Sequence, residues 1–594
     1  MIKLPSKLLR SVIKPARYIG GEYNSVIKTK NIPVRFAMCF PDIYEIGMSN
    51  LGTKIIYDLL NKRDDTWCER VYAPWIDFEK VLRDNNKLLY GLESSDELNK
   101  FDFLGFTLQY ELSFTNILNM IDMSNIPVFS KDRENDYPFI VCGGPCASNP
   151  YPLSIFVDIF LLGEGEEILN EIIDKYVIWK KSGLSKQEYL KSIKDIEGVF
   201  IPTIHTKNDV ITKRIIEDMN TVIYPTDLVV PSTEILQNRI SLEIFRGCKN
   251  GCRFCQAGYI YRPVREKNTD TLMNILDKSL TSTGTRNVSL SSLSTSDYSS
   301  LNELCYKIFD YRENKNLNVS LPSLRIDTVD LDVINKTDIK KSLTFAPEAG
   351  SQRLRDVINK NLSKEEIISS VKKAYLNGIT SIKLYFMIGL PTETFADVAD
   401  IVKLSNEIVE LYYELPKELR KKRLSITVAT STFVPKAHTP FMWCKQDSEE
   451  QITMKQNYLK EKLNNKCITY KWHNIKASKI EALIARGDTK VGYVIYTAWK
   501  NGAKFDSFDE CLNYTAWEKA LDRENIDISD YIYKEYDLDY NFCFDNINYM
   551  VDKEFLKSEY LKAMKNIRTD KCDVKCNNCG ILKYTKCNLK RIKK

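Results

Sequence analysis

RISLEIFRGCKNGCRFCQAG, residues 239–258, places three cysteines, Cys248, Cys252 and Cys255, in one short loop. An apolar run that ends at Phe245 predicts a strand just before this loop. Zinc sites have four ligands, often in pairs with the spacing Cys-x2-Cys. Here three thiols lie close together, and no fourth Cys or His is near in the sequence. The spacing Cys-x3-Cys-x2-Cys therefore favours an iron–sulfur cluster with one iron left open.

The composition is that of a globular protein without a strongly charged coat. Of the 594 residues, 43% are hydrophobic and 28% are charged, and the net charge is +6. This balance argues against an overall nucleic-acid-binding or membrane-binding coat. The N-terminus lacks the apolar core of a signal peptide, and no run approaches the roughly 18 apolar residues of a membrane span. We therefore expect a cytoplasmic protein without membrane contact, whose 16 cysteines include metal ligands.

The segment 33–180 alternates strand-like and helix-like patterns. The run VRFAMCF at 34–40 is apolar enough for a buried parallel strand. Strands separated by helices predict an α/β domain with a doubly wound parallel sheet, which binds ligands at the carboxyl ends of its strands. Further strand candidates lie at 68–74, 87–94, 101–108, 139–145 and 157–162.

A second alternating region covers residues 238–445. Its β/α repeats predict a partial (β/α)6 barrel with its chemistry at the carboxyl ends of the strands. The strand candidates lie at 239–245, 287–293, 318–324, 342–348, 381–391 and 425–435. Around the two domains we place an N-terminal extension at 1–32, a linker at 181–237, a mainly helical region at 446–565 and a Cys-rich basic tail at 566–594.

The first cysteine loop resembles the signature of the radical S-adenosylmethionine (SAM) superfamily, including the aromatic Phe254 directly before the third cysteine. The resemblance implies that Cys248, Cys252 and Cys255 bind three corners of a [4Fe–4S] cluster and that SAM chelates the open iron. An electron from the cluster then breaks a C–S bond of SAM and yields a 5′-deoxyadenosyl radical. The resemblance also implies that Phe254 packs near the SAM adenine.

Other strand ends match the superfamily's SAM contacts in the expected order. The resemblance implies contacts with the methionyl group after the second strand, a polar contact after the fourth, and backbone contacts with adenine after the fifth. These contacts would come, in chain order, from Ser291, Ser292, Arg325, Glu348, Gly389 and Pro391.

The N-terminal domain resembles the cobalamin-binding domain that is fused to many radical SAM enzymes. In that domain a loop after the first strand reads Asp-x-His-x-x-Gly, and its His ligates cobalt. Here the loop has Asp42 and Gly47 but Tyr44 in place of the His, and a phenol with a pKa near 10 is a poor neutral ligand. Two alternatives remain open: cobalamin bound with an open or water-filled lower face, or a pocket that has lost the cofactor. The resemblance assigns the cradle of the nucleotide tail to Thr107, Gly143 and Gly144.

A second cysteine group lies near the end of the chain. Cys572, Cys576 and Cys579 repeat the spacing of the first group, and Cys587 follows eight residues later. Four thiols in a short segment can complete a closed site, so we expect a second [4Fe–4S] cluster or a structural zinc ion. Nearly the whole chain resembles a poorly characterised subfamily of cobalamin-type radical SAM proteins that end in this second motif.

These motifs predict a radical SAM enzyme that modifies an unactivated carbon of an RNA, a protein or a metabolite. With cobalamin we expect methyl transfer, and without it methylthiolation, rearrangement or another radical step. The resemblance implies a flavodoxin-type or ferredoxin-type reducing partner. One alternative is a non-catalytic iron–sulfur or zinc protein that binds RNA or a partner through the basic tail, and another is a cobalamin enzyme without radical initiation. His438 is a candidate substrate contact or acid–base group, or else a turn residue.

Overall fold

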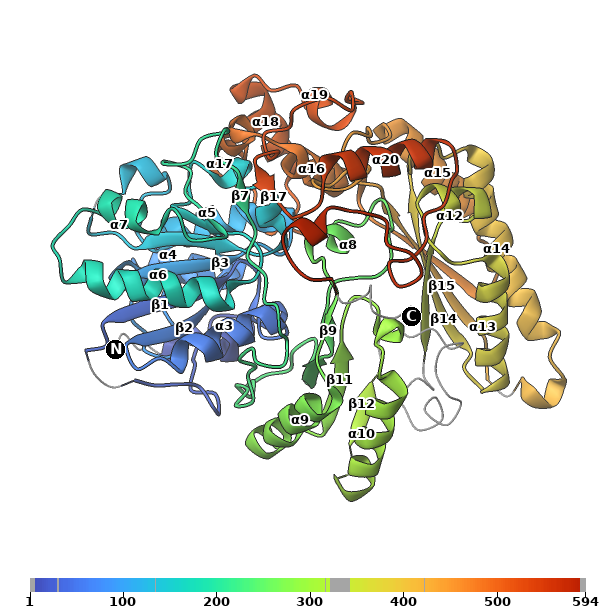
Figure 1. Ribbon diagram of the computed structural model, residues 1–594, viewed down its shortest axis with the longest axis horizontal. Helices are drawn as coiled ribbons and strands as arrows, with labels where there is room; N and C mark the ends of the chain where they lie inside the picture. The colour runs from blue at the N-terminus through green and yellow to red at the C-terminus, as the bar shows by residue number, and fades with distance from the viewer. Residues whose placement is uncertain are drawn as a thin grey trace.

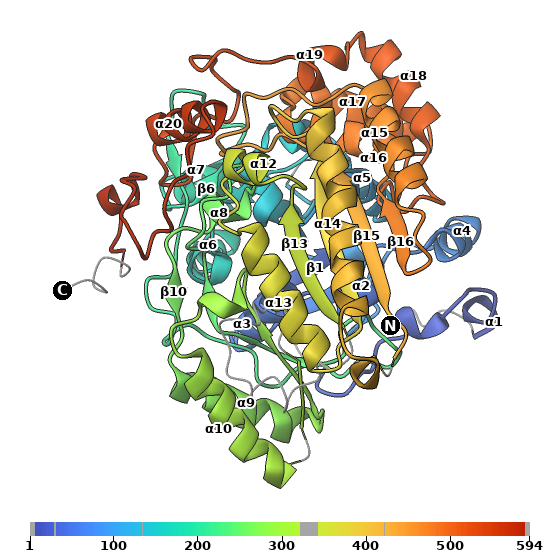
Figure 2. The same ribbon diagram turned by 90° about the vertical axis from the view of Figure 1, so that its right-hand side faces the viewer.

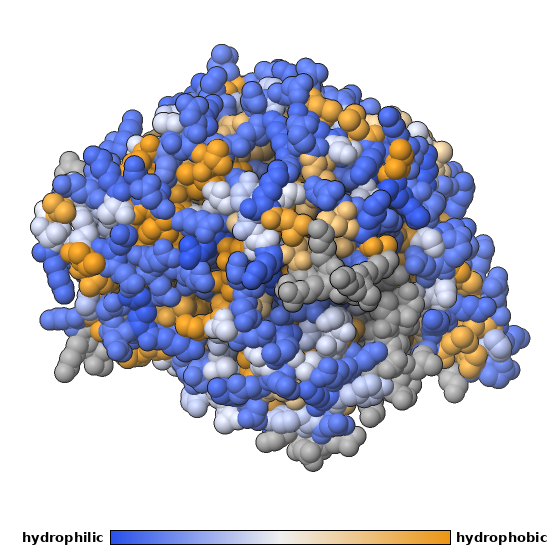
Figure 3. Space-filling model, in the orientation of Figure 1, coloured by the Kyte–Doolittle hydropathy of each residue, from blue (hydrophilic) through white to orange (hydrophobic). Residues whose placement is uncertain are grey.

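The computed structural model describes residues 6–28, 31–133, 135–315, 317–320, 342–420 and 422–587. Arg325, one of the expected SAM contacts, and the basic residues 588–594 lie outside these ranges. Within the described residues, no helix is both long enough and apolar enough to cross a bilayer. Hydrophilic residues predominate on the face shown in Figure 3.

The N-terminal domain is a six-stranded sheet in the order β2-β1-β3-β4-β5-β6 (Figure 1). Strands β1 to β5 pair in parallel, and β6 is antiparallel to β5. Helices cover both faces, which confirms the predicted doubly wound sheet. The strands are β1 (Val34–Phe40), β2 (Thr66–Tyr72), β3 (Phe103–Thr107), β4 (Phe139–Gly143), β5 (Ile159–Leu161) and β6 (Val199–Phe200). The helices are α3 (Leu51–Asn61), α4 (Ile76–Asp84), α5 (Phe114–Met123), α6 (Gly165–Lys180) and α7 (Lys186–Ile193).

The apolar run of β1 explains why this strand lies inside the sheet. Successive side chains of a strand point to opposite faces. Phe36 and Met38 pack in a core with α3, α6 and α7, whereas Ala37 and Cys39 pack in a core with α4 and α5. Because both faces are buried, the strand is apolar at every one of these positions rather than at alternate ones.

Residues 87–94 do not form the strand that we predicted. The amides of Leu89 and Leu92 bond instead to the carbonyl oxygens of Met123 and Arg70, at 3.0 Å each. Both leucines are buried. The apolar pattern therefore reflected burial of a loop, and only an isolated bridge forms here, at Tyr90.

The second domain has two parallel sheets, β12-β11-β8 and β13-β14-β15-β16, around one apolar core. Leu242 and Leu290 of the first sheet share that core with Leu384 and Val428 of the second. Figure 2 shows α13 and α14 across the outer face of the second sheet. The strands are β8 (Ile240–Glu243), β11 (Asn287–Ser291), β12 (Asn318–Ser320), β13 (Leu343–Glu348), β14 (Ser381–Ile388), β15 (Ser425–Thr432) and β16 (Ile468–Trp472). The helices are α9 (Thr269–Thr283), α10 (Leu301–Lys315), α12 (Gln352–Val357), α13 (Lys364–Leu376), α14 (Phe395–Tyr413) and α15 (Glu449–Lys462).

These sheets form the expected partial barrel and add one strand to it. We expected mainly helix after residue 445, yet β16 pairs in parallel with β15. Ile468 and Tyr470 of β16 pack against the barrel core, which accounts for its place in the sheet. The predicted capping box of α13 is present, since Ser363 and Glu366 exchange hydrogen bonds with each other's backbone amides.

The C-terminal helices pack against the N-terminal domain. Residues of α16, α17 and α18 share one core with α5 and with one face of the first sheet. The short strands β7 (Ile211–Thr212) and β17 (Ile547–Asn548) pair in parallel and join the linker to this region. The helices are α16 (Ile475–Arg486), α17 (Thr489–Lys500), α18 (Tyr514–Glu524), α19 (Ser529–Ile532) and α20 (Lys553–Met564).

Candidate functional site

The first cysteine loop begins directly after the short strand β9 (Phe245–Arg246). Gly247 has a φ of +91°, and a Cβ there would lie 2.6 Å from the carbonyl oxygen of Pro263. Only glycine lets the chain turn at this point. The loop closes when the amide of Cys255 donates to the carbonyl oxygen of Cys252 at 3.1 Å, and α8 (Ala257–Ile260) follows. The three thiols are half-buried.

Two residues of the loop anchor Cys248 to the segment that follows β11. Lys249 Nζ donates to the carbonyl oxygen of Asp297 at 2.6 Å. The Asn250 amide group donates to the Asp297 carboxylate at 3.0 Å and to the sulfur of Cys248 at 3.6 Å. These bonds fix the loop and place an N–H donor at the sulfur, which is a means of tuning an iron–sulfur centre.

A half-buried ion pair lies beside the other two thiols. Glu348 and Lys360 are 3.3 Å apart, and both act electrostatically on Cys252 and Cys255. Burial raises the pKa of Cys252 to about 12, and Lys360 opposes this shift. Lys360 therefore favours the thiolate, which is the form that binds metal.

The first loop supplies three half-buried thiols. A structural zinc site needs four protein ligands. In a cubane each cysteine binds a different iron, so three thiols would hold three corners of a [4Fe–4S] cluster.

Phe254 and the turn after β14 meet in one apolar cluster. Phe254 packs against a buried group that includes Leu390. Gly389, with a φ of +79°, and Pro391 flank Leu390, and the amide of Gly389 donates to Glu393 at 2.9 Å. Phe254 and Leu390 thus belong to one apolar cluster, and the adenine site stays a prediction.

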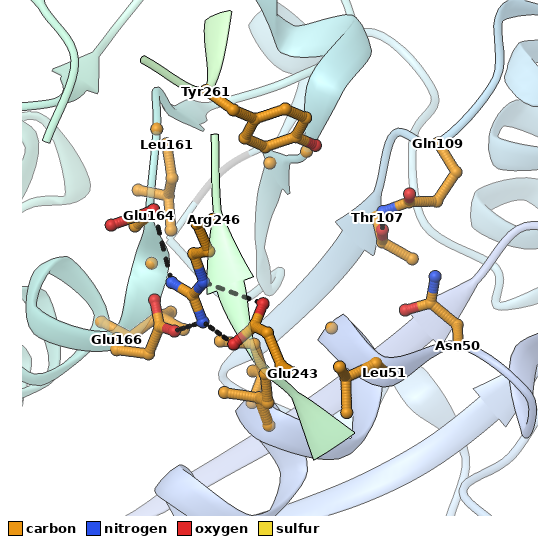
Figure 4. A pocket seen from close by; sticks show the side chains of 18 of the residues that line it. Asn50, Leu51, Thr107, Gln109, Leu161, Glu164, Glu166, Glu243, Arg246 and Tyr261 are labelled. Atoms are coloured by element: carbon orange, nitrogen blue, oxygen red, sulfur yellow. Dashed lines mark hydrogen bonds and ion pairs between the residues drawn. The ribbon is translucent and has the colours of Figure 1, made fainter. Parts of the chain in front are cut away.

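A cavity of about 420 Å³ lies where the carboxyl ends of the N-terminal strands face the second domain (Figure 4). The N-terminal domain supplies the ends of β3, β4 and β5 and the first turn of α3. The second domain supplies the ends of β9 and β11. The polar and aromatic lining residues include Asn50, Thr107, Gln109, Glu164, Glu166, Glu243, Arg246, Tyr261, Ser291 and Ser292.

Two sets of expected cofactor residues face this one cavity. Ser291 and Ser292 are expected SAM contacts, and Thr107, Gly143 and Gly144 are the expected cradle of the cobalamin tail; all five line the cavity. The structure therefore places the two predicted cofactor sites next to each other.

A charged network forms one wall of the cavity (Figure 4). Arg246 lies 2.7 Å from Glu166 of the N-terminal domain and 2.9 Å from Glu243 of the barrel. Burial raises the pKa of Glu243, but Arg246 and Lys267 outweigh this effect and hold the pKa at about 2. Three cations face three carboxylates, so the buried charges balance. The network consists of Arg246, Arg265, Lys267, Glu164, Glu166 and Glu243.

The loop after β1 does not reach this cavity. Asp42, Tyr44 and Gly47 are absent from its lining. The helical turn α2 (Tyr44–Gly47) buries the Tyr44 ring against Tyr72, and the Tyr44 hydroxyl donates to Glu22 at 3.0 Å. Tyr44 therefore has a packing role here. No His lines the cavity either, so its described walls offer no imidazole ligand.

The second cysteine group lines a separate cavity of about 440 Å³. Cys572, Cys576, Cys579 and Cys587 all border it. Cys576 is exposed, and the other three cysteines are half-buried. The metal site expected from these four thiols stays a prediction.

His438 faces neither cavity. Its Nε2 lies 2.9 Å from the carbonyl oxygen of Ser148, and its ring packs on Phe544 and Tyr549. Burial lowers the pKa of His438 to about 4. These contacts support the structural role and leave no acid–base role near the cysteines.

Sequence reasoning did not single out several of the residues around these cavities. Asn50 lines the 420 Å³ cavity and caps α3 by accepting from the amide of Thr53 at 2.9 Å. An Asn before a helical pattern is a recognisable cap signal, so Asn50 could have been found. Lys360 follows α12 in a loop and carries no such signal.

Two family models match the chain. Residues 52–202 match the model described as "Radical SAM proteins, N-terminal", and residues 242–405 match the one described as "Radical SAM superfamily". A curated relative, the uncharacterized protein MJ0966 of Methanocaldococcus jannaschii, is 29% identical over 476 residues. The match covers 78% of this chain and 90% of the relative.

Two solved structures of TsrM, a radical SAM methyltransferase from Kitasatospora setae, are similar at low levels. One contains tryptophan and the SAM analog aza-SAM; it is 13% identical, has a TM-score of 0.45, and covers 68% of this chain and 74% of its own. The other contains cobalamin and a [4Fe–4S] cluster; it is 12% identical, has a TM-score of 0.43, and covers 67% and 72%.

Proposed function

This chain belongs to the radical SAM superfamily, and from that premise we propose that it cleaves SAM reductively at a [4Fe–4S] cluster held by Cys248, Cys252 and Cys255. The observation that carries the proposal is the loop itself. Three half-buried thiols follow the strand β9 in one short loop. When bound, the cluster and SAM together supply a 5′-deoxyadenosyl radical.

The residues around the loop would bind and orient SAM. Glu348 has a φ of +66°, a backbone region that favours glycine. Strain of this kind persists where the surrounding fold imposes it, often at ligand sites. We infer that the Glu348 carboxylate accepts from the amino group of SAM, while Phe254 and the 389–391 turn enclose the adenine and exclude water.

We further propose that the 420 Å³ cavity binds cobalamin and that the reaction methylates an unactivated carbon. Thr107, Gly143 and Gly144 line this cavity and would hold the nucleotide tail. Gly144 has a φ of +116°, and a Cβ there would lie 2.9 Å from the carbonyl oxygen of Leu108, so the wall has no room for a side chain. Because no His lines the cavity, the corrinoid would bind without an imidazole from these walls. Ser291 borders the same space, which suits methyl transfer from SAM.

Formation of 5′-deoxyadenosine tests the first proposal. The protein is reconstituted anaerobically with iron and sulfide, reduced with dithionite and mixed with SAM, and the nucleoside is measured by mass spectrometry. We expect SAM-dependent product, at least about a hundredfold more than with Cys252→Ala, because removing a ligand leaves the cluster incompletely held. Cys511→Ser, which changes a half-buried cysteine outside both groups, is the matched control and should retain activity.

The corrinoid proposal has its own test. Hydroxocobalamin is added to the purified protein, and after gel filtration the bound corrinoid is quantified by visible absorbance. We expect one corrinoid per chain. A protein that retains none would leave the cluster proposal intact and direct the reaction toward a cobalamin-independent modification such as methylthiolation.

A further inference from the structure

The second cysteine group borders a single pocket. A turn at Gly580 brings the thiols together: its φ is +97°, and a Cβ there would lie 2.5 Å from the Asp552 carboxyl carbon. The amide of Asp552 donates to the carbonyl oxygen of Cys579 at 3.0 Å. This contact fixes the cysteine segment to the start of α20, and the four thiols border the resulting 440 Å³ space.

Four thiols that border one cavity can hold a zinc ion or the four corners of a [4Fe–4S] cluster. Zinc has no redox chemistry, whereas an iron–sulfur cluster transfers electrons. The hydrogen bond between this group and the first loop therefore favours the cluster. With every corner ligated, such a cluster has no open iron for a substrate.

A buried cation beside the thiols points to an anionic occupant. Arg262 is 4% exposed and forms no ion pair with a carboxylate among the described residues. Its Nη1 group has no hydrogen-bond partner there. Arg262 Nε donates to the carbonyl oxygen of Gly258 at 2.9 Å, so Nη1 is the donor left for an occupant. A cubane with four thiolate ligands carries net negative charge, which would pair with this guanidinium.

The second cysteine group lies directly against the first loop. The amide of Cys572 donates to the carbonyl oxygen of Lys249 at 3.1 Å, and Lys249 is the neighbour of Cys248. Figure 1 shows the C-terminal segment passing beside α8, which follows the first loop. One hydrogen bond and two peptide units therefore connect a ligand of one centre with a ligand of the other.

We propose that Cys572, Cys576, Cys579 and Cys587 hold an auxiliary [4Fe–4S] cluster that passes electrons to the cluster of the first loop. The exposed Cys576 marks the side of entry, and Cys572 the side of exit. A low-potential one-electron protein donor reduces the auxiliary cluster, and the same electron then moves to the first cluster. The auxiliary cluster is reoxidised in each transfer, so no electron is lost or gained.

Metal analysis tests the site independently of SAM cleavage. We expect about eight iron and eight sulfide per reconstituted chain, since each cubane contributes four of each. The variant Cys248→Ala/Cys252→Ala/Cys255→Ala should keep about four iron, and Cys572→Ala/Cys576→Ala/Cys579→Ala should keep about four as well. One zinc with about four iron in the wild type, or no iron in the first variant, would overturn the assignment. The first variant leaves the second cysteine group unchanged, so it decides the matter even if the other fails to fold.

Reduction kinetics test the relay. Reduced flavodoxin is mixed with the wild type and with the second triple variant, and bleaching of the first cluster is followed by stopped-flow absorbance. We expect the variant to be reduced at least tenfold more slowly by flavodoxin and at an unchanged rate by dithionite. Equal rates with flavodoxin would refute the relay, whether or not the protein cleaves SAM.

Discussion

Replacing Arg253 should loosen both the first cysteine loop and the segment that leads to Cys572. Arg253 lies between Cys252 and Phe254 in the first cysteine loop, and its side chain is fully buried. Its guanidinium lies 3.1 Å from Glu559 of α20 and donates to the carbonyl oxygens of Val357 at 2.8 Å and Ile567 at 2.7 Å. One side chain therefore joins the loop to α20 and to the segment that leads to Cys572.

The cost of Arg253→Met follows from what it leaves behind. Glu559, 1% exposed, would lose its guanidinium partner. Removing one member of a buried ion pair costs about 3–5 kcal/mol. Glu559 keeps Thr569 at 2.8 Å and Lys562 at 2.7 Å, so we expect the lower end, about 3 kcal/mol. That free energy corresponds to roughly a hundredfold in an opening equilibrium.

Hydrogen exchange with mass spectrometry reads this opening locally. The amide of Thr569, bonded to Asn359 at 2.8 Å, and that of Cys572 should exchange roughly a hundredfold faster in Arg253→Met. The matched control is the double variant Arg253→Met/Glu559→Gln, which removes both charges and should exchange more slowly than the single variant. Exchange in peptides covering 566–573 that stays within threefold of the wild type would refute the reasoning.

Three further substitutions test the SAM site, the corrinoid site and the buried His438 separately. Glu348→Gln should keep its iron but form 5′-deoxyadenosine about ten- to a hundredfold more slowly, because a charge-assisted hydrogen bond is worth about 1.5–3 kcal/mol; an unchanged rate would remove Glu348 from the SAM site. Gly144→Ala should weaken corrinoid binding about tenfold in a titration, since its Cβ would meet Leu108, while product formation from SAM alone stays unchanged. His438→Asn should flatten the pH dependence of the melting temperature. The pKa of His438 in the native protein, about 4, lies below its unfolded value near 6.5. The stability that this difference contributes, at most about 3 kcal/mol, is complete above pH 6.5 and is lost as the pH falls toward 4. Parallel curves of melting temperature against pH for the wild type and His438→Asn would contradict this expectation.

The sequence was sufficient for the parts of the fold that depend on local pattern. Apolar runs such as 34–40 became buried strands, and Ser363 with Glu366 marked a helix start. The same signal failed at 87–94, because burial of leucines does not require pairing with another strand. It also missed β16, whose short run ITYKW is half-exposed and gains its place only by pairing with β15.

The candidate site also has features that the sequence predicts and features that it does not. Both cysteine groups could be predicted because their ligands lie within short loops. Contacts between distant segments could not be predicted: Arg246 meets Glu166 from 80 residues away, and Arg262 reaches thiols more than 300 positions later. Tyr44 shows another limit of reasoning from sequence. It occupies the position of the cobalt-binding His of the cobalamin-binding domain, but the helical turn α2 directs its ring into the core.

The central claim is that three thiolates hold a cluster whose fourth iron binds SAM. Electron–nuclear double resonance of the dithionite-reduced protein with SAM labelled by ¹⁵N at the amino group measures that contact directly. The account predicts a ¹⁵N hyperfine coupling to the cluster that disappears in Cys255→Ala. A reduced cluster that binds SAM without any such coupling would contradict it.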